Sequence, residues 1–350
     1  MNNLAIVLTT IQPPTDSVVQ LYTRLKDFSD ISFYVIGDKK GPSEYNLESH
    51  ECSRHARIKV DFKALNEQLE SPFELAQKLP LGHYSRKNLG YLYAVSQGAK
   101  CIYETDDDNA PLEFWQTRNE HVNNVHIVDS NKDHRWINIY RYFSKETIWP
   151  RGLPLDEIHT PVPRIRCNGS TEVWSPIQQG LVNNSPDVDA IWRLVMGRPF
   201  DFENNQSVYL TPGNWCPFNT QSTWWWPVAY PLLYIPSYCS FRMCDIWKSF
   251  VAQRCLWEVD AGITFHAPEV VQERNVHNLM HDFRNEIPGY ERNDEIILIL
   301  DNLKLKSGSA HIIGNLQRCY EALVKAKIFP EDELNLLKLW LDDIENYIRY

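Results

Sequence analysis

The sequence lacks several features that would each define a class of protein. Its eight cysteines include no C-x-x-C pair, which argues against a structural zinc site and against a disulfide framework in a chain of 350 residues. We therefore expect reduced thiols and a cytoplasmic protein. No stretch approaches the roughly 20 apolar residues that span a bilayer. The opening MNNLAIVLTT has no basic region, so we expect neither a signal peptide nor a transmembrane segment, which leaves open peripheral association with a membrane.

An excess of positive charge is also missing. The chain has 35 basic and 45 acidic side chains, and this balance argues against a general nucleic-acid-binding protein. It leaves room for a local basic pocket that binds a phosphorylated small molecule. Internal repeats and low-complexity tracts are absent as well. With 43% hydrophobic residues, the chain can bury a sizeable core.

What the sequence does contain is an alternation of buried strands and amphipathic helices. The N-terminal strands are expected at residues 3–11, 31–38, 57–62 and 101–106, and the helices at 16–28 and 84–100. Asp16 is a candidate cap for the first helix. This order predicts an α/β domain with a mostly parallel sheet, in which ligands bind at the carboxyl ends of the strands.

The second half of the chain has a different pattern. Residues 120–240 are rich in Pro, Trp and Asn and predict short strands and long loops, followed by a helix at 242–260 and a strand at 262–268. After Pro288, three amphipathic helices are expected. We therefore divide the chain into a catalytic domain at 1–288 and a C-terminal helical appendage at 289–350.

An acidic triplet, Asp106–Asp108, ends the predicted strand at 101–106. Three adjacent carboxylates repel one another, and a divalent cation such as Mg²⁺ or Mn²⁺ would relieve that repulsion. A D-x-D pattern after an apolar strand is typical of nucleotide-sugar binding. The alternative is a solvated turn, because Asp and Asn are common where strands end.

Four separated segments strengthen the nucleotide-sugar interpretation. They are YSRKNLGYLYAVSQGAKCIYETDDDNAP, IWPRGLP, IQQGLVNNSPDVDAIWRL and CDIWKSFVAQRCLWEVDAGITFHAPEV. Together they resemble the STELLO-type glycosyltransferases, formerly a domain of unknown function, over about residues 4–285. That family is distantly similar to the reversibly glycosylated polypeptides, which are UDP-arabinopyranose mutases. The helices after about residue 290 lie outside this match.

The resemblance implies a GT-A-like fold, a bound Mn²⁺ or Mg²⁺ and a nucleoside-diphosphate sugar donor, with UDP sugars favoured. The acceptor would be a hydroxyl group on a glycan or a lipid-linked glycan, in polysaccharide or glycoconjugate synthesis. The plant STELLO proteins carry a membrane anchor and lie in the Golgi, so their cellular role is not carried over. Two alternatives stay open: a nucleotide-sugar mutase, and a scaffold without turnover in a glycan-synthesis complex.

The donor site is expected at the ends of the first strands. In a GT-A-like sheet, Thr9 and Thr10 would contact the nucleobase and ribose, and Asp38 would accept ribose or base hydrogens. The alternative for all three is turn chemistry. Arg86 and Lys87 begin a helix, where free N–H groups favour a diphosphate; the alternative is a solvated basic face.

The metal and the sugar complete the expected site. Asp106 and Asp108 would hold the ion, with His266 as a third ligand or else a structural histidine. Asp107 would contact the sugar or hold the turn.

The remaining carboxylates and one arginine are assigned to the sugar and the reaction. Asp187 and Asp189 would bind sugar hydroxyls, although Asp187 could cap a helix instead. Asp245 would act as a base or stabilise developing positive charge, or serve as a helix N-cap. Arg151 lies in the stiff segment WPRGLP and would contact phosphate or sugar. It aligns with the arginine that is glycosylated in the mutases, but the F-x-x-R that follows there is absent, which argues against self-glycosylation.

Overall fold

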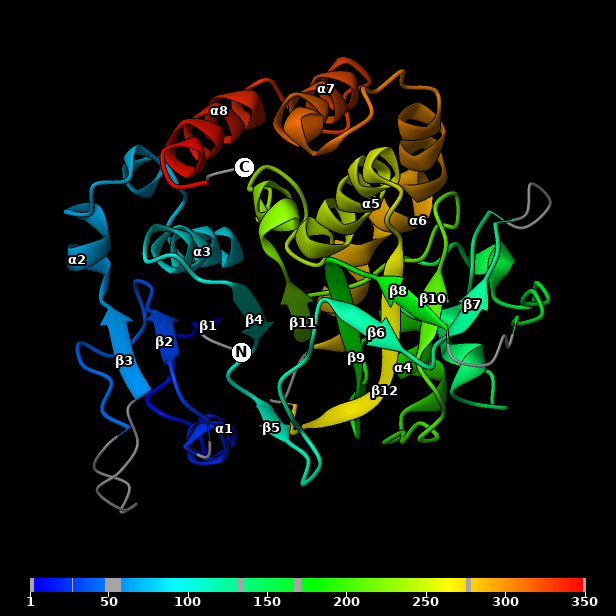
Figure 1. Ribbon diagram of the computed structural model, residues 1–350, viewed down its shortest axis with the longest axis horizontal. Coiled ribbons are helices and arrows are strands. Elements are labelled where there is room, and N and C mark those ends of the chain that lie inside the picture. Colours follow the sequence, from blue (N-terminus) through cyan, green and yellow to red (C-terminus); the bar gives the residue numbers. More distant parts are fainter. Residues whose placement is uncertain are drawn as a thin grey trace.

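The computed structural model describes residues 3–26, 28–47, 58–130, 135–166, 171–274 and 278–348. Their centre is one twisted sheet with the strand order β3-β2-β1-β4-β11-β9-β12-β10-β7, and β5 pairs with β12 (Figure 1). Within these residues, five of the nine pairings are parallel. The predicted α/β class with a mostly parallel sheet is confirmed, and the arrangement is consistent with a GT-A-like fold.

The N-terminal half of the sheet is entirely parallel. It consists of β1 (Leu4–Thr9), β2 (Ile31–Ile36), β3 (Ile58–Lys63) and β4 (Cys101–Thr105). Along β1, Leu4, Ile6 and Leu8 face a cluster with helix α1, whereas Ala5 and Val7 face a cluster with helix α3. Alternate residues of a strand point to opposite faces, so the apolar run seen in the sequence is the signature of a strand covered on both sides.

The covering helices begin differently from the prediction. Helix α1 (Asp16–Leu25) is capped by Thr15, whose hydroxyl accepts the backbone N–H of Val18 at 3.2 Å; the assignment of Asp16 as the cap was wrong by one residue. The predicted helix at 84–100 is a 3₁₀ turn, Tyr84–Arg86, followed by α3 (Lys87–Ser96). The short helix α2 (Leu65–Leu69) follows β3 in the sequence.

The second half of the sheet is mixed. Its strands are β5 (Asn109–Pro111), β7 (His126–Val128), β9 (Ile177–Asn183), β10 (Val208–Leu210), β11 (Ser222–Trp225) and β12 (Ile263–Gln272). A separate ribbon pairs β6 (His121–Asn123) with β8 (Glu172–Trp174). The helices here are α4 (Ala190–Met196) and α5 (Cys244–Leu256), and every residue of α5 is buried.

Three long helices close the chain: α6 (Leu279–Asp301), α7 (Ile312–Lys325) and α8 (Asp332–Glu345). Helix α7 packs on α5 and α8 packs on α3 (Figure 1). Their apolar faces belong to the same hydrophobic cluster as β1 and α3. The expected domain boundary after residue 288 falls inside α6, and the division into two domains stays a prediction. None of the helices in the described ranges is long and apolar enough to cross a bilayer.

Candidate active site

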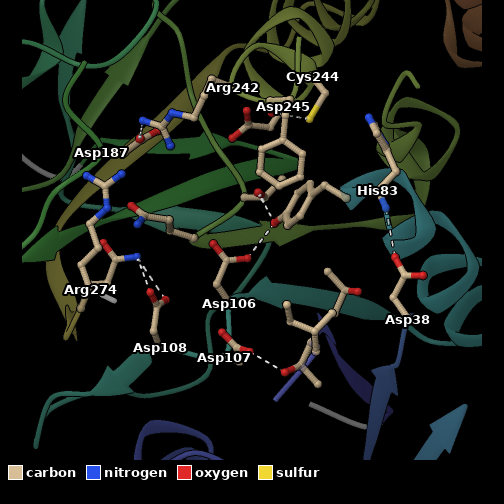
Figure 2. A pocket seen from close by; sticks show the side chains of 18 of the residues that line it. Asp38, His83, Asp106, Asp107, Asp108, Asp187, Arg242, Cys244, Asp245 and Arg274 are labelled. Atoms are coloured by element: carbon tan, nitrogen blue, oxygen red, sulfur yellow. Dashed lines mark hydrogen bonds and ion pairs between the residues drawn. The ribbon is translucent and has the colours of Figure 1, made fainter. Parts of the chain in front are cut away.

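A cavity of about 710 Å³ opens at the carboxyl ends of β1, β2 and β4. This is the edge where parallel α/β sheets bind ligands. Nine of the predicted site residues line it: Thr9, Thr10, Asp38, Asp106, Asp107, Asp108, Arg151, Asp187 and Asp245. In Figure 2, the acidic triplet lies between Asp38 and His83 on one side and Asp187, Arg242 and Arg274 on the other.

Each carboxylate of the triplet is held by a different element. Asp106 accepts hydrogen bonds from the hydroxyl of Tyr84 at 2.7 Å and from Nζ of Lys87 at 3.1 Å. Asp107 accepts the hydroxyl of Thr10 at 2.5 Å, after the end of β1. Asp108 accepts Nε2 of Gln272, the last residue of β12, at 3.0 and 3.1 Å. The triplet is therefore fixed toward the cavity from both halves of the sheet.

The carboxylates are crowded as well as buried. Burial raises the pKa of Asp108 to about 7, and the charges of Asp106 and Asp107 add to the rise. Burial also raises the pKa of Asp107, with Asp106 contributing. Lys87 is the one ammonium that contacts the triplet among the described residues. A bound cation would offset the remaining negative charge.

These carboxylates suit a hard divalent ion. In the described ranges, no group of three or more His, Cys, Asp or Glu side chains forms a ready-made metal cage. Mg²⁺ in phosphate-transferring sites usually takes one or two protein carboxylates and completes its shell with water and substrate phosphates. Asp106 and Asp108 offer that number of oxygen ligands at the rim of the cavity.

Thr9 and Asp38, where nucleotide contacts were expected, line the cavity but have local partners. The hydroxyl of Thr9 donates to the carbonyl of Ile36 at 2.9 Å. The carboxylate of Asp38 accepts the backbone N–H groups of Lys39, Gly82 and His83 at 2.7, 2.9 and 3.0 Å. Asp38 therefore joins the turn before α3 to the end of β2. This is the turn role that the sequence offered as the alternative to a ligand contact.

Arg86 and Lys87 do not form a diphosphate-binding helix start, contrary to the prediction. Arg86 is fully buried, and its guanidinium donates to Gln68 Oε1 at 2.7 Å and to backbone carbonyls, away from the cavity. Lys87 is also fully buried. Its Nζ donates hydrogen bonds to Asp106 and, at 2.7 Å, to the carbonyl of Thr105. Arg86 ends the 3₁₀ turn and Lys87 begins α3, and both side chains are buried inside the protein, which the sequence pattern does not reveal.

Arg151 is saturated by two aspartates. Its guanidinium bonds both oxygens of Asp187 at 2.8 Å and both oxygens of Asp245 at 2.9 and 2.8 Å, and it also donates to the carbonyl of Arg242. All five N–H donors of an arginine are thereby used. Arg151 therefore has no donor left for phosphate or sugar, and the expected ligand contact is replaced by a positioning role.

The backbone and charges around Arg151 explain this geometry. Gly152 has φ of +95°, and a Cβ there would lie 2.5 Å from Ile246 on α5. Burial alone would raise the pKa of Asp187, but Arg151, Arg242 and Arg193 outweigh it and lower that pKa below the ordinary value. Asp187 is thus held as a carboxylate at the cavity wall.

Asp245 lies in the first turn of α5, and Met243 occupies the N-cap position, so the N-cap alternative is wrong. Asp189 is the residue that caps α4: it accepts the N–H of Trp192 at 2.8 Å and the indole N–H of Trp149 at 2.7 Å. Fully buried in this role, Asp189 does not line the cavity and cannot contact a sugar there, contrary to the prediction.

His266 lies in a different place from the triplet. It lines a second cavity of about 270 Å³, where Ser207 contacts Nδ1 at 2.7 Å and Gln178 contacts Nε2 at 3.0 Å. His266 stands six positions before Gln272 on β12, about 20 Å along an extended strand. The prediction that His266 ligates the same ion as Asp106 and Asp108 was wrong; it is a structural histidine.

The sequence analysis missed several residues at the cavity. Tyr84, Gln272, Arg193 and Arg274 all line it. Gln272 and Arg274 stand at and just after the carboxyl end of β12. The rule applied to the first four strands, that ligand contacts follow strand ends, would have found them had β12 been predicted to run to residue 272.

Comparison with known proteins bears on this arrangement. The family described as STELLO glycosyltransferases matches residues 242–349. Two proteins of Arabidopsis thaliana, the probable glycosyltransferases STELLO2 and STELLO1, are 27% and 26% identical and cover 76% and 75% of this chain. A mycobacterial protein of known structure aligns with 94% of this chain and 76% of its own length at 11% identity and a TM-score of 0.39.

The family match and the two plant relatives confirm the resemblance to the STELLO-type glycosyltransferases. The family match includes α6, α7 and α8, which corrects the expectation that the C-terminal helices lie outside the resemblance. The chain spans about a third of the length of the plant relatives, 35% and 34%.

Proposed function

We propose that this protein is a metal-dependent glycosyltransferase that uses a nucleoside-diphosphate sugar, with UDP sugars favoured, and a hydroxyl acceptor on a glycan or lipid-linked glycan. One observation carries the proposal: three carboxylates, each held in place by a neighbouring element, converge on a large cavity at the carboxyl edge of the parallel strands. The resemblance to the STELLO-type glycosyltransferases supports the same class of reaction.

In this proposal Asp106 and Asp108 hold Mn²⁺ or Mg²⁺, which when bound neutralises negative charge on the departing diphosphate. Lys87 and Tyr84 hold the carboxylate of Asp106 at the rim. Thr10 orients Asp107, whose carboxylate lines the cavity and is assigned to a sugar hydroxyl. The nucleotide lies against the loop after β1, beside Thr9 and Asp38.

Asp245 is the carboxylate we place nearest the reacting carbon. It faces the cavity, and Arg151 holds both of its oxygens. A carboxylate oxygen accepts more than one hydrogen bond, so Asp245 can still receive a hydroxyl proton or stabilise positive charge on the sugar. The occupied guanidinium of Arg151 disfavours the arginine glycosylation known from the mutases.

The first experiment measures UDP binding by calorimetry with and without Mn²⁺. We expect binding that requires the metal, and we expect Asp106→Asn and Asp108→Asn each to weaken it at least tenfold. The matched control is Asp129→Asn, an exposed aspartate paired with Arg166 outside the cavity. Equal UDP affinity with and without metal, or unchanged affinity in both variants, would refute the metal site.

Turnover is tested separately with a panel of UDP sugars and Mn²⁺. Release of UDP together with a glycosylated acceptor supports transfer, whereas recovery of a ring-isomerised sugar nucleotide identifies a mutase. Metal-dependent UDP binding without any turnover of the panel points to the scaffold.

A further inference from the structure

Three arginines gather on the wall of the cavity beside Asp187. Arg193 comes from α4, Arg242 from the residues before α5, and Arg274 from the segment after β12. Figure 2 shows the guanidinium groups of Arg242 and Arg274 close to Asp187, across the cavity from Asp38 and His83. None of the three is needed to hold the acidic triplet.

Two of these arginines have carboxylate partners behind the wall. Arg242 pairs with Glu286 at 2.9 Å, and Arg274 pairs with Asp282 at 2.7 Å. Both partners come from α6 and are buried. Each guanidinium carries several donors, so these one-sided pairs leave N–H groups on the cavity side.

Arg193 has neutral partners only. Its guanidinium donates to the hydroxyl of Ser185 at 3.0 Å and to the carbonyl of Pro186 at 2.6 Å. Across the described ranges, no Asp or Glu forms a salt bridge with it, and its Nε is buried without a hydrogen-bond partner. A partly buried cation in this setting is costly unless an anion completes it.

The charges around Arg193 also favour the binding of an anion there. Burial, together with repulsion from Arg274 and Arg242, lowers the pKa of Arg193 to about 9, although Asp187 and Glu286 act in the opposite direction. The nearest carboxylate in the cavity, Asp187, is already bonded through both oxygens to Arg151. The described part of the protein therefore brings three guanidinium groups together and supplies no acid in a salt bridge with the third, Arg193.

We propose that Arg193, Arg242 and Arg274 form a subsite for a carboxylate or phosphate group of the sugar substrate, separate from the donor diphosphate. Guanidinium matches both groups in two-point geometry. The proposal rests on the proposed glycosyl transfer and narrows its substrates to anionic ones. The anion belongs either to the donor sugar, as in a uronic acid, or to a phosphorylated acceptor.

The test compares the unmodified chain with Arg193→Gln, because Arg193 has no ion pair with any described residue whose loss would unfold the protein. Arg193→Lys keeps the charge and should retain part of the binding. The control is Arg198→Gln, just beyond the same helix, whose exposed side chain pairs with Glu146 outside the cavity.

The donor arm measures the affinities of UDP-glucose and UDP-glucuronate in the presence of Mn²⁺. The acceptor arm titrates inorganic phosphate and glucose 1-phosphate into protein saturated with UDP and Mn²⁺. We expect at least a tenfold preference for UDP-glucuronate, or phosphate binding to the UDP-loaded protein. Arg193→Gln should abolish whichever is observed and leave the affinity for UDP unchanged.

Three results separate failure of this subsite from failure of the proposed function. Metal-dependent UDP binding with no anion preference and no phosphate binding overturns the subsite alone. Phosphate binding that UDP displaces, together with weaker UDP binding in Arg193→Gln, shows that the arginines hold the diphosphate and also overturns it. If UDP does not bind at all, phosphate binding to the free protein that Arg193→Gln removes still supports the subsite, and its persistence in that variant refutes it.

Discussion

Arg151 and Asp245, 94 residues apart in the chain, meet in a two-point ion pair at 2.9 and 2.8 Å. The other edge of the same guanidinium is taken by Asp187. The pair joins the loop around Gly152 to the first turn of α5 and holds two carboxylates at the wall of the cavity. Its strength comes from burial, since all three side chains are at most 8% exposed.

Removing Arg151 should therefore cost the fold as well as the site. Arg151→Met removes the ion-pair partner of the buried Asp245 and the closest cation of Asp187, which keeps Arg242 at 4.0 Å, and we expect the free energy of unfolding to fall by about 3–5 kcal/mol. Urea denaturation measures this loss. Arg166→Met, which breaks the exposed pair with Asp129, should change the same quantity by less than about 1 kcal/mol. Similar losses in both variants would contradict the buried-pair interpretation.

Replacing Lys87 tests whether its ammonium group is a buried counter-charge of Asp106 or a ligand of the diphosphate. Lys87→Met should lower the free energy of unfolding by about 3 kcal/mol, because Asp106 loses its buried cationic partner. The affinity for Mn²⁺ without nucleotide should rise, since a positive charge next to Asp106 has gone. Calorimetry with Mn²⁺ alone checks this.

The control for that experiment is Lys40→Met, an exposed lysine that lines the same cavity. We expect its stability to stay within about 0.5 kcal/mol of the unmodified chain. A loss of Mn²⁺ affinity in Lys87→Met would show instead that Lys87 mainly orients Asp106.

A substitution at Gly90 tests how closely α3 packs on the sheet that carries the site. A Cβ at this position would lie 2.5 Å from Val7 on β1 and 3.0 Å from Ile36 on β2. Gly90→Ala should lower the free energy of unfolding by about 1–3 kcal/mol, despite the better helix propensity of alanine. Gly314→Ala, in the exposed face of α7 with nothing within 4 Å, should raise it by up to about 1 kcal/mol. Stabilisation of both variants would refute the close approach of α3.

The buried imidazole of His266 should make the folded protein less stable as the pH falls. Burial holds its pKa well below 6.5 in the folded chain, and the charge of Arg118 lowers it further. The unfolded chain binds a proton near pH 6.5 and the folded chain does not. The contribution of His266 to stability is therefore complete above pH 6.5 and is lost as the pH falls, by up to about 1.4 kcal/mol per unit.

The measurement compares unfolding free energies from pH 7.5 to 5 in the unmodified chain and in His266→Gln. Glutamine can still bond Ser207 and Gln178, and we expect a shallower decrease with falling pH. His311→Gln, at an exposed position, should keep the slope of the unmodified chain. Equal slopes in all three proteins would contradict a neutral buried His266.

Much of the architecture could be predicted from local patterns. The runs that became β1, β2 and β4 are continuous and rich in β-branched residues, and only strands buried on both faces need such a pattern. The acidic triplet was found because it follows one of these strands, and strand ends define the ligand edge of an α/β sheet. Length and hydrophobic period also located α5, α7, α8 and the second half of α6, whose first ten residues precede the expected start after Pro288.

The site residues that were misplaced share a physical cause. Arg86, Asp189 and His266 were chosen for their residue type and their place in the sequence, but each finds its partners inside the protein. A 3₁₀ turn directs Arg86 inward, and the unpredicted length of β12 separates His266 from the triplet. Such directions depend on contacts between residues far apart in the chain.

The amino-acid sequence by itself determined the fold class and the acidic edge, because hydrophobic period and strand-end carboxylates are local properties of the chain. Only the tertiary structure decided which charges are available to a ligand. Arg151 was one of the arginines that the sequence singled out, yet two distant aspartates occupy its donors. Arg193 enters the same cavity without a carboxylate partner in the described part of the chain. Two charged groups pair when the fold brings them close together, and their separation along the sequence does not reveal which groups will meet.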